Sequence, residues 1–278
     1  MVPCGMIPLA ITAGNTFILK PSEQTPLSGM RLAEYLKEAG LPDGVFNVVN
    51  GAKTIVESLC DHPDIKALAF VGSSSVAKIV YTRCSQNSKR SICLGGAKNH
   101  MIVVPDADKD STAKGLLASS MGSAGQRCMA ASVAVGVSDI DHIIEQLIEE
   151  AKNFKLGVDM GTIISKDALN RINGYIDEAE KMGAKVLVDG RNMSPPDDYK
   201  DGYWLGATIL DNVDPEWPSA KEEIFGPVLS IIRADTIEDA MKIENDNPYG
   251  NAAAVFTTSG QIAKVVSEKA SAGMIGVN

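Results

Sequence analysis

A cysteine that follows a loop of small residues is the first candidate for chemistry in this sequence. Cys128 comes directly after the segment 122–127, Gly-Ser-Ala-Gly-Gln-Arg. Small residues allow the main chain to approach a ligand closely, and an accessible loop thiol can act as a nucleophile. The alternative is a buried structural cysteine, because catalytic cysteines have no local signature that transfers between families.

Three other segments carry residues suited to a nucleotide. Lys20 and Glu23 follow an apolar run and could hydrogen-bond the vicinal hydroxyls of a ribose. Ser73 follows Phe-Val-Gly where a helix is expected to begin, so its hydroxyl and the main-chain N–H groups could bind a phosphate. Glu223 stands beside Phe225 and a Gly-Pro turn. For each, the alternative is an ordinary turn, with solvated charges or with Phe225 in the core.

The pattern around these residues alternates between short apolar runs and amphipathic segments, which is typical of a parallel sheet covered by helices, an α/β fold. The expected strands are 45–49, 67–71, 101–104, 132–137, 185–188, 228–232, 252–256 and 274–277. The expected helices are 26–38, 54–60, 75–83, 108–121, 141–154, 166–182, 237–245 and 260–272. The best internal boundary lies near His100, which gives domains 1–100 and 101–278.

Composition excludes several classes of protein. Hydrophobic residues are 45% and charged residues 22% of the 278 residues, as in an average globular protein rather than a disordered chain. The net charge of −9 leaves no basic stripe, so we expect no nucleic-acid partner. Prolines interrupt the apolar stretch 1–19, so we expect no membrane helix. The five cysteines and three histidines lack zinc spacing, so we expect no metal and a reducing compartment.

Taken together, the motifs resemble those of the aldehyde dehydrogenase superfamily, and they occur in the family's order along nearly the whole chain. They are the segments 14–16, 20–23, 70–73, 125–128, 223–228, 247–250, 255–257 and 273–278. Within that superfamily the chain looks most similar to the methylmalonate-semialdehyde dehydrogenases, on the segments 60–67, 96–100, 105–107, 125–130 and 247–251.

The resemblance implies an aldehyde dehydrogenase-like fold, with a partial Rossmann-like NAD-binding domain in residues 1–100 and a catalytic domain in 101–278. It implies that Cys128 attacks the aldehyde carbon, that hydride passes to NAD, and that a thioester remains on the cysteine. The NAD-binding residues it implies are Lys20, Glu23 and Gln24 at the adenosine ribose, Ser73 at the pyrophosphate, Gly95 and Phe225 at the nicotinamide, and Glu223 at the nicotinamide ribose.

The resemblance also bears on substrate and product. Arg127 suits a substrate that carries its own carboxylate, although it could instead pair with a nearby acid. Residues 85–105 contain no Asp or Glu, and Cys93 or Leu94 stands where hydrolytic members have a water-activating glutamate. We therefore expect transfer to coenzyme A. Methylmalonate or malonate semialdehyde would give propanoyl-CoA or acetyl-CoA with loss of CO2. A hydrolytic NAD(P)-dependent enzyme with Glu223 as base is the alternative.

The family's segments before residue 1 and after residue 278 have no counterpart here, so we expect a piece of a longer protein. We expect this piece alone to be inactive, or to serve only as a binding or assembly partner. The resemblance further implies a homo-oligomer, dimer or tetramer, in the mitochondrial matrix or the bacterial cytoplasm. It leaves open whether the pathway is valine, pyrimidine or inositol breakdown.

Overall fold

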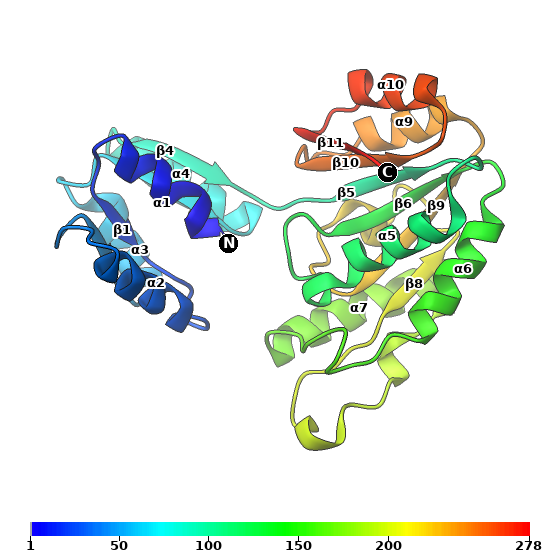
Figure 1. Ribbon diagram of the computed structural model, residues 1–278, viewed down its shortest axis with the longest axis horizontal. Coiled ribbons are helices and arrows are strands. Elements are labelled where there is room, and N and C mark those ends of the chain that lie inside the picture. Colours follow the sequence, from blue (N-terminus) through cyan, green and yellow to red (C-terminus); the bar gives the residue numbers. More distant parts are fainter. Residues whose placement is uncertain (1) are drawn as a thin grey trace. The chain divides into compact units, whose positions relative to one another are not determined.

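The computed structural model describes residues 2–278, and the chain divides into two compact units between Gly96 and Ala97 (Figure 1). The sequence placed the boundary near residue 100. It lies slightly earlier because Asn99 and His100 are the first residues of a strand in the second unit. In residues 2–278 no helix combines the length and the apolar character needed to cross a membrane.

The first unit is built from four helices and two parallel strand pairs, β1 with β2 and β3 with β4. Its elements are α1 (Val2–Thr12), β1 (Phe17–Leu19), α2 (Leu27–Glu38), β2 (Phe46–Val48), α3 (Lys53–Asp61), β3 (Ala67–Val71), α4 (Ser74–Gln86) and β4 (Arg90–Leu94). A small core joins Cys60, Val80 and Cys84 between α3 and α4.

The apolar side of α2 is only partly covered. Leu27 and Met30 of this helix are 80% and 40% exposed. No residue of α2 is fully buried, because the short strand β2 is the main element that packs against this helix.

The second unit is a seven-stranded sheet in the order β11-β10-β5-β6-β9-β8-β7, parallel except for the β7–β8 pair. Its strands are β5 (Asn99–Val103), β6 (Ala131–Val137), β7 (Lys185–Val188), β8 (Thr208–Asp211), β9 (Val228–Ala234), β10 (Ala252–Phe256) and β11 (Met274–Val277). Its α-helices are α5 (Lys109–Met121), α6 (Asp141–Lys152), α7 (Lys166–Met182), α8 (Pro218–Lys221), α9 (Ile237–Asn245) and α10 (Gly260–Lys269).

Helices cover both faces of this sheet. The chain moves from β5 through α5 to β6, and later from β9 through α9 back across the sheet to β10. Because parallel crossovers are right-handed, these opposite moves place α5 and α9 on opposite faces. The helix α6 packs beside α5 and α10 beside α9, which gives two helical layers around one hydrophobic core (Figure 1). The predicted α/β fold is confirmed.

Because β5, β6, β9 and β10 run parallel, the loops that lead into them lie at one edge of the sheet. Parallel strands have their amino ends at the same edge of the sheet. The segments that lead into these four strands therefore gather there, and they include Ala97, Cys128, Glu223 and Asn251.

The elements with no counterpart in the sequence prediction include α1, β4, β8 and the short helix α8. The helix α1 contains Pro8, which removes a main-chain donor and argues against a helix. The strand β4 alternates exposed and half-buried residues, and β8 has only four residues. Tertiary contacts rather than local pattern stabilise such elements.

The buried ion pair across β8 and β9 provides a test of the fold. Arg233 donates two hydrogen bonds to Asp211, at 2.9 and 2.8 Å, and also pairs with Asp141 at 2.8 Å. The Asp211 side chain is 7% exposed and that of Asp141 is 70% exposed. We expect Asp211→Ala to lower the free energy of unfolding by about 1.5–3 kcal/mol, because it removes two charge-assisted hydrogen bonds from a carboxylate that is 7% exposed, while Asp141 still pairs with Arg233.

Asp141→Ala is the matched control, since it removes the exposed partner of the same arginine and is expected to cost about 1 kcal/mol or less. Urea unfolding of the two variants measures both values. Equal losses would contradict the assignment of Asp211 as the structural partner.

Candidate active site

The loop that carries Cys128 begins where α5 ends. Ser123, Ala124 and Gly125 all have positive φ, at 54°, 53° and 65°, so the chain makes a left-handed turn there. Position 125 needs a glycine for two reasons, its positive φ and a close contact with a neighbouring loop. A Cβ at this position would lie 2.0 Å from the carbonyl oxygen of Gly226. The turn therefore presses directly against the loop before β9.

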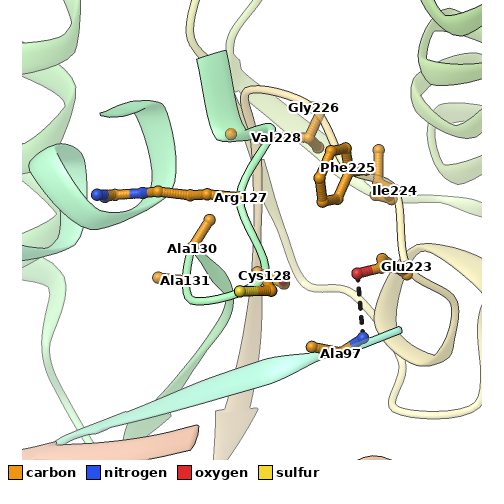
Figure 2. A pocket seen from close by; sticks show the side chains of 12 residues that line it. Ala97, Arg127, Cys128, Ala130, Ala131, Glu223, Ile224, Phe225, Gly226 and Val228 are labelled. Atoms are coloured by element: carbon orange, nitrogen blue, oxygen red, sulfur yellow. Dashed lines mark hydrogen bonds between the residues drawn. The ribbon is translucent and has the colours of Figure 1, made fainter. Parts of the chain in front are cut away.

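This close approach creates a small pocket at the amino edge of the sheet (Figure 2). Cys128 lines it from one loop, Glu223 and Phe225 line it from another, and Ala97 lines it from the segment before β5. The Cys128 thiol is free and partly exposed. The structure thus places Cys128 in the same pocket as Glu223 and Phe225, although the sequence has them in two segments about a hundred positions apart.

Glu223 is held by the main chain. Its Oε1 accepts the N–H of Ala97 at 3.0 Å, which joins the loop before β9 to the segment before β5 (Figure 2). Phe225 has φ of 54° and its side chain is 39% exposed, so it is not the core residue of the alternative interpretation. An exposed ring beside a carboxylate can pack against a planar ligand.

Arg127 points away from Glu223, towards the end of α5 (Figure 2). Its Nη2 donates to the carbonyl oxygens of Ala118 and Ser119, at 2.8 and 2.9 Å. The last carbonyls of a helix lack intrahelical partners and favour a nearby cation. The arginine therefore caps a helix rather than pairing with an acid. Its Nε is buried and makes no hydrogen bond.

The sequence missed two asparagines that contact the nucleophile candidate. The side-chain amides of Asn99 and Asn251 both donate to the carbonyl oxygen of Cys128, each at 2.8 Å. Both residues lay in segments that carried the resemblance, but nothing in the local pattern placed them near Cys128.

Lys98 is the other residue that the sequence missed. It is 1% exposed, and its Nζ donates to the carbonyl oxygen of Ser219 at 2.9 Å. Desolvation lowers the pKa of Lys98 to about 7, although nearby Glu223 and Glu222 act in the opposite direction. In the sequence this lysine appeared only within the segment 96–100 that carried the resemblance.

In the first unit, three of the predicted residues follow β1. The Nζ of Lys20 donates to the carbonyl oxygen of Gly51 at 2.8 Å and lies 3.5 Å from Glu23. The main-chain N–H of Gln24 donates to the Ser22 hydroxyl at 3.3 Å. The lysine and the glutamate are therefore adjacent, as a ribose site requires.

Ser73 and Gly95 lie at the carboxyl ends of the paired strands β3 and β4. Ser73 directly precedes α4 and contacts the Ser75 hydroxyl at 3.2 Å. A Cβ on Gly95 would lie 2.8 Å from the Ser74 hydroxyl, so this position accommodates only glycine without a shift. Leu94 is 51% exposed. Throughout residues 2–278, no three His, Cys, Asp or Glu side chains are placed to hold a metal ion.

Comparison with known proteins gives one consistent family. The model of the aldehyde dehydrogenase family matches residues 1–278. The rat mitochondrial methylmalonate-semialdehyde/malonate-semialdehyde dehydrogenase [acylating] is 44% identical in an alignment of 284 residues that covers 100% of this chain and 53% of the relative. The malonate-semialdehyde dehydrogenase of Pseudomonas aeruginosa is 44% identical in an alignment of 286 residues that covers 100% of this chain and 57% of the relative. The chain thus spans about half the length of these relatives.

Solved structures agree with this result. The methylmalonate-semialdehyde dehydrogenase of Oceanimonas doudoroffii superimposes with a TM-score of 0.96 at 44% identity, over 100% of this chain and 58% of that one. An indole-3-acetaldehyde dehydrogenase in complex with NAD+ gives a TM-score of 0.94 at 32% identity, over 100% of this chain and 57% of that one.

The left-handed turn before Cys128 can be tested with two glycines. We expect Gly125→Ala to lower the free energy of unfolding by about 3 kcal/mol or more, because positive φ and the contact with Gly226 act together. Gly174→Ala, in α7 with nothing within 4 Å of its Cβ, is the control. It is expected to raise stability by about 0.5–1 kcal/mol. Thermal unfolding that places Gly125→Ala at or above the wild type would contradict this.

The buried lysine predicts a dependence of stability on pH. The pKa of Lys98 is about 7 in the folded chain, compared with 10.5 for an ordinary lysine side chain. The unfolded chain therefore binds more protons between these values, and folding becomes more favourable as pH rises through this window. We expect Lys98→Met to remove this gain, which is at most about 1.4 kcal/mol per pH unit.

The measurement is urea unfolding at several pH values from 7 to 10. Lys264→Met is the control, because the Lys264 side chain is 73% exposed. If the stability of wild type and Lys98→Met rises in parallel with pH, the interpretation of Lys98 is wrong.

Proposed function

This chain belongs to the aldehyde dehydrogenase family, and from that premise we propose that it carries the nucleophile of an NAD-dependent, CoA-acylating semialdehyde dehydrogenase. The proposed substrates are methylmalonate and malonate semialdehyde, which the curated relatives at 43–48% identity bear in their names. The observation that carries the proposal is the shared pocket of Cys128, Glu223 and Phe225.

In this proposal Cys128 makes the covalent bond. Its thiolate adds to the aldehyde carbon and gives a thiohemiacetal, and loss of hydride leaves a thioester on Sγ. NAD, when bound, supplies the hydride acceptor. The residues present suit this group. Glu223 uses Oε1 for Ala97 and keeps Oε2 for a ribose hydroxyl, and the exposed Phe225 ring can pack beside a planar base.

The residues of the first unit are proposed to hold the rest of the dinucleotide. Lys20 and Glu23, with Gln24 beside them, would bind the adenosine ribose. Ser73 would bind the pyrophosphate at the amino end of α4, where helix N–H groups favour an anion. Gly95 would allow the main chain to approach the nicotinamide. These assignments follow the family resemblance and the local geometry of each segment.

The release step follows from what surrounds the thioester. Among the lining residues Glu223 is the one carboxylate, and Ala97 already occupies one of its oxygens. With little to activate water, the thioester would persist until the thiol of coenzyme A attacks it. The Cys128 thiol is then regenerated, the acyl group leaves as an acyl-CoA, and the carboxylate β to it is lost as CO2.

Arg127 enters this proposal with fewer donors than the sequence suggested. Ala118 and Ser119 engage its Nη2 and its Nε is buried, so Nη1 is the donor left for a substrate carboxylate. The presence of Glu223 in the pocket also supports a second candidate, a hydrolytic enzyme in which Oε2 activates water.

The test compares the isolated chain with a chimaera in which it replaces the matching part of the Pseudomonas aeruginosa relative. We expect the isolated chain to show no turnover, and the chimaera to form NADH from malonate semialdehyde only when CoA is present. Cys128→Ser in the chimaera is expected to lower the rate about 10³-fold or more. Cys93→Ser is the matched control and should retain activity.

Three outcomes separate the alternatives. NADH formation without CoA, with free acid as the product in mass spectrometry, would favour the hydrolytic enzyme. A folded chimaera that forms no NADH would favour an inactive assembly partner. Turnover that survives Cys128→Ser would exclude Cys128 as the nucleophile.

A further inference from the structure

Two side-chain amides converge on one main-chain oxygen at the candidate site. Asn99, the first residue of β5, and Asn251, directly before β10, each donate from Nδ2 to the carbonyl oxygen of Cys128 at 2.8 Å. A carbonyl oxygen has two lone pairs, so these two bonds use its full capacity. The peptide group between Cys128 and Met129 is therefore fixed from two directions.

Asn99 is fully engaged in this arrangement. Its second N–H donates to the carbonyl oxygen of Ala130 at 2.8 Å, and its Oδ1 accepts the N–H of Ala252 at 3.1 Å. The residue is 5% exposed. A buried amide with every group satisfied is costly to disturb, because the partners would be left without hydrogen bonds.

Asn251 has a narrower set of contacts. Its amide donates to the Cys128 carbonyl and lies 3.2 Å from the Met129 sulfur. Both contacts are with the loop that carries the nucleophile candidate. The same loop is also held by a turn bond from the Ala130 N–H to the Arg127 carbonyl and by the Ser119 hydroxyl, which accepts the N–H of Ala131. Its earlier part is held by the side chains of Arg127, bonded to the end of α5, and of Gln126, bonded to Thr162 and Ile164.

We infer that Asn99 and Asn251 are positioning residues for Cys128, which clamp its main chain so that the thiol is held at the pocket instead of moving with a flexible loop. The significance of the clamp for catalysis rests on the proposed function. The clamp itself concerns only the mobility of residues 128–130 and can be measured without any substrate.

The purely structural alternative is that the amides hold β5, β6 and β10 together. Asn99 bridges all three strands and cannot separate the two interpretations. Asn251 can, since both of its contacts are with residues 128 and 129. Asn245→Leu is the matched control: its amide donates to the carbonyl oxygen of Lys269, far along the chain from Cys128.

The experiment measures the alkylation rate of Cys128 by iodoacetamide in the folded 278-residue chain, by peptide mass spectrometry. Cys4, which is exposed, serves as the internal reference. We expect Asn251→Leu to speed alkylation of Cys128 about fivefold, the factor that one lost hydrogen bond of typical net strength gives. Asn251→Ala removes the same donors without adding a charge, and is expected to act in the same direction.

The control variant distinguishes a specific effect on the Cys128 loop from a general loss of stability. Asn245→Leu is expected to leave Cys128 alkylation unchanged even where its melting temperature falls as far as that of Asn251→Leu. Alkylation in the Asn251 variants that is unchanged, slower, or matched by Asn245→Leu would overturn the inference. Because alkylation needs neither NAD nor aldehyde, its result is independent of whether the proposed activity is found.

Discussion

The amino edge of four parallel strands is the constraint on which the candidate site depends. Each loop that enters this edge must satisfy its own main-chain polar groups while lying against its neighbours. The approach of Gly125 to the Gly226 carbonyl shows how little room is left, because even a methyl group would collide. A thiol, a carboxylate and an aromatic ring meet here because the sheet direction brings their loops to one place.

Three consecutive polar residues at the amino end of β5 hold these loops in place. Lys98, Asn99 and His100 are all buried, and a buried polar side chain must find partners. Lys98 reaches Ser219, and Asn99 reaches the Cys128 loop. Burial lowers the pKa of His100 to about 4, so its ring stays neutral beside Asn247. Three consecutive residues thus connect three separate segments of the chain to β5 by hydrogen bonds.

Much of the fold follows from sequence, and the site follows only in part. The segment from β9 to β11 has strong apolar periodicity, and its helices and strands were predicted within a few residues. Motif context also singled out Cys128, Glu223 and Phe225, which line one pocket. Asn99 and Asn251 act through contacts 29 and 123 residues along the chain. No periodicity encodes such distances, so only the packed structure reveals them.

Arg127 shows that adjacency in sequence does not fix what a side chain binds. It lines the pocket beside Cys128, yet its guanidinium donates to the carbonyls of Ala118 and Ser119 at the end of α5. Glu223 is remote in sequence and lines the same pocket. A helix end therefore competes with any substrate carboxylate for this arginine. Carboxylate recognition by Arg127 would need the donors that the helix end does not use.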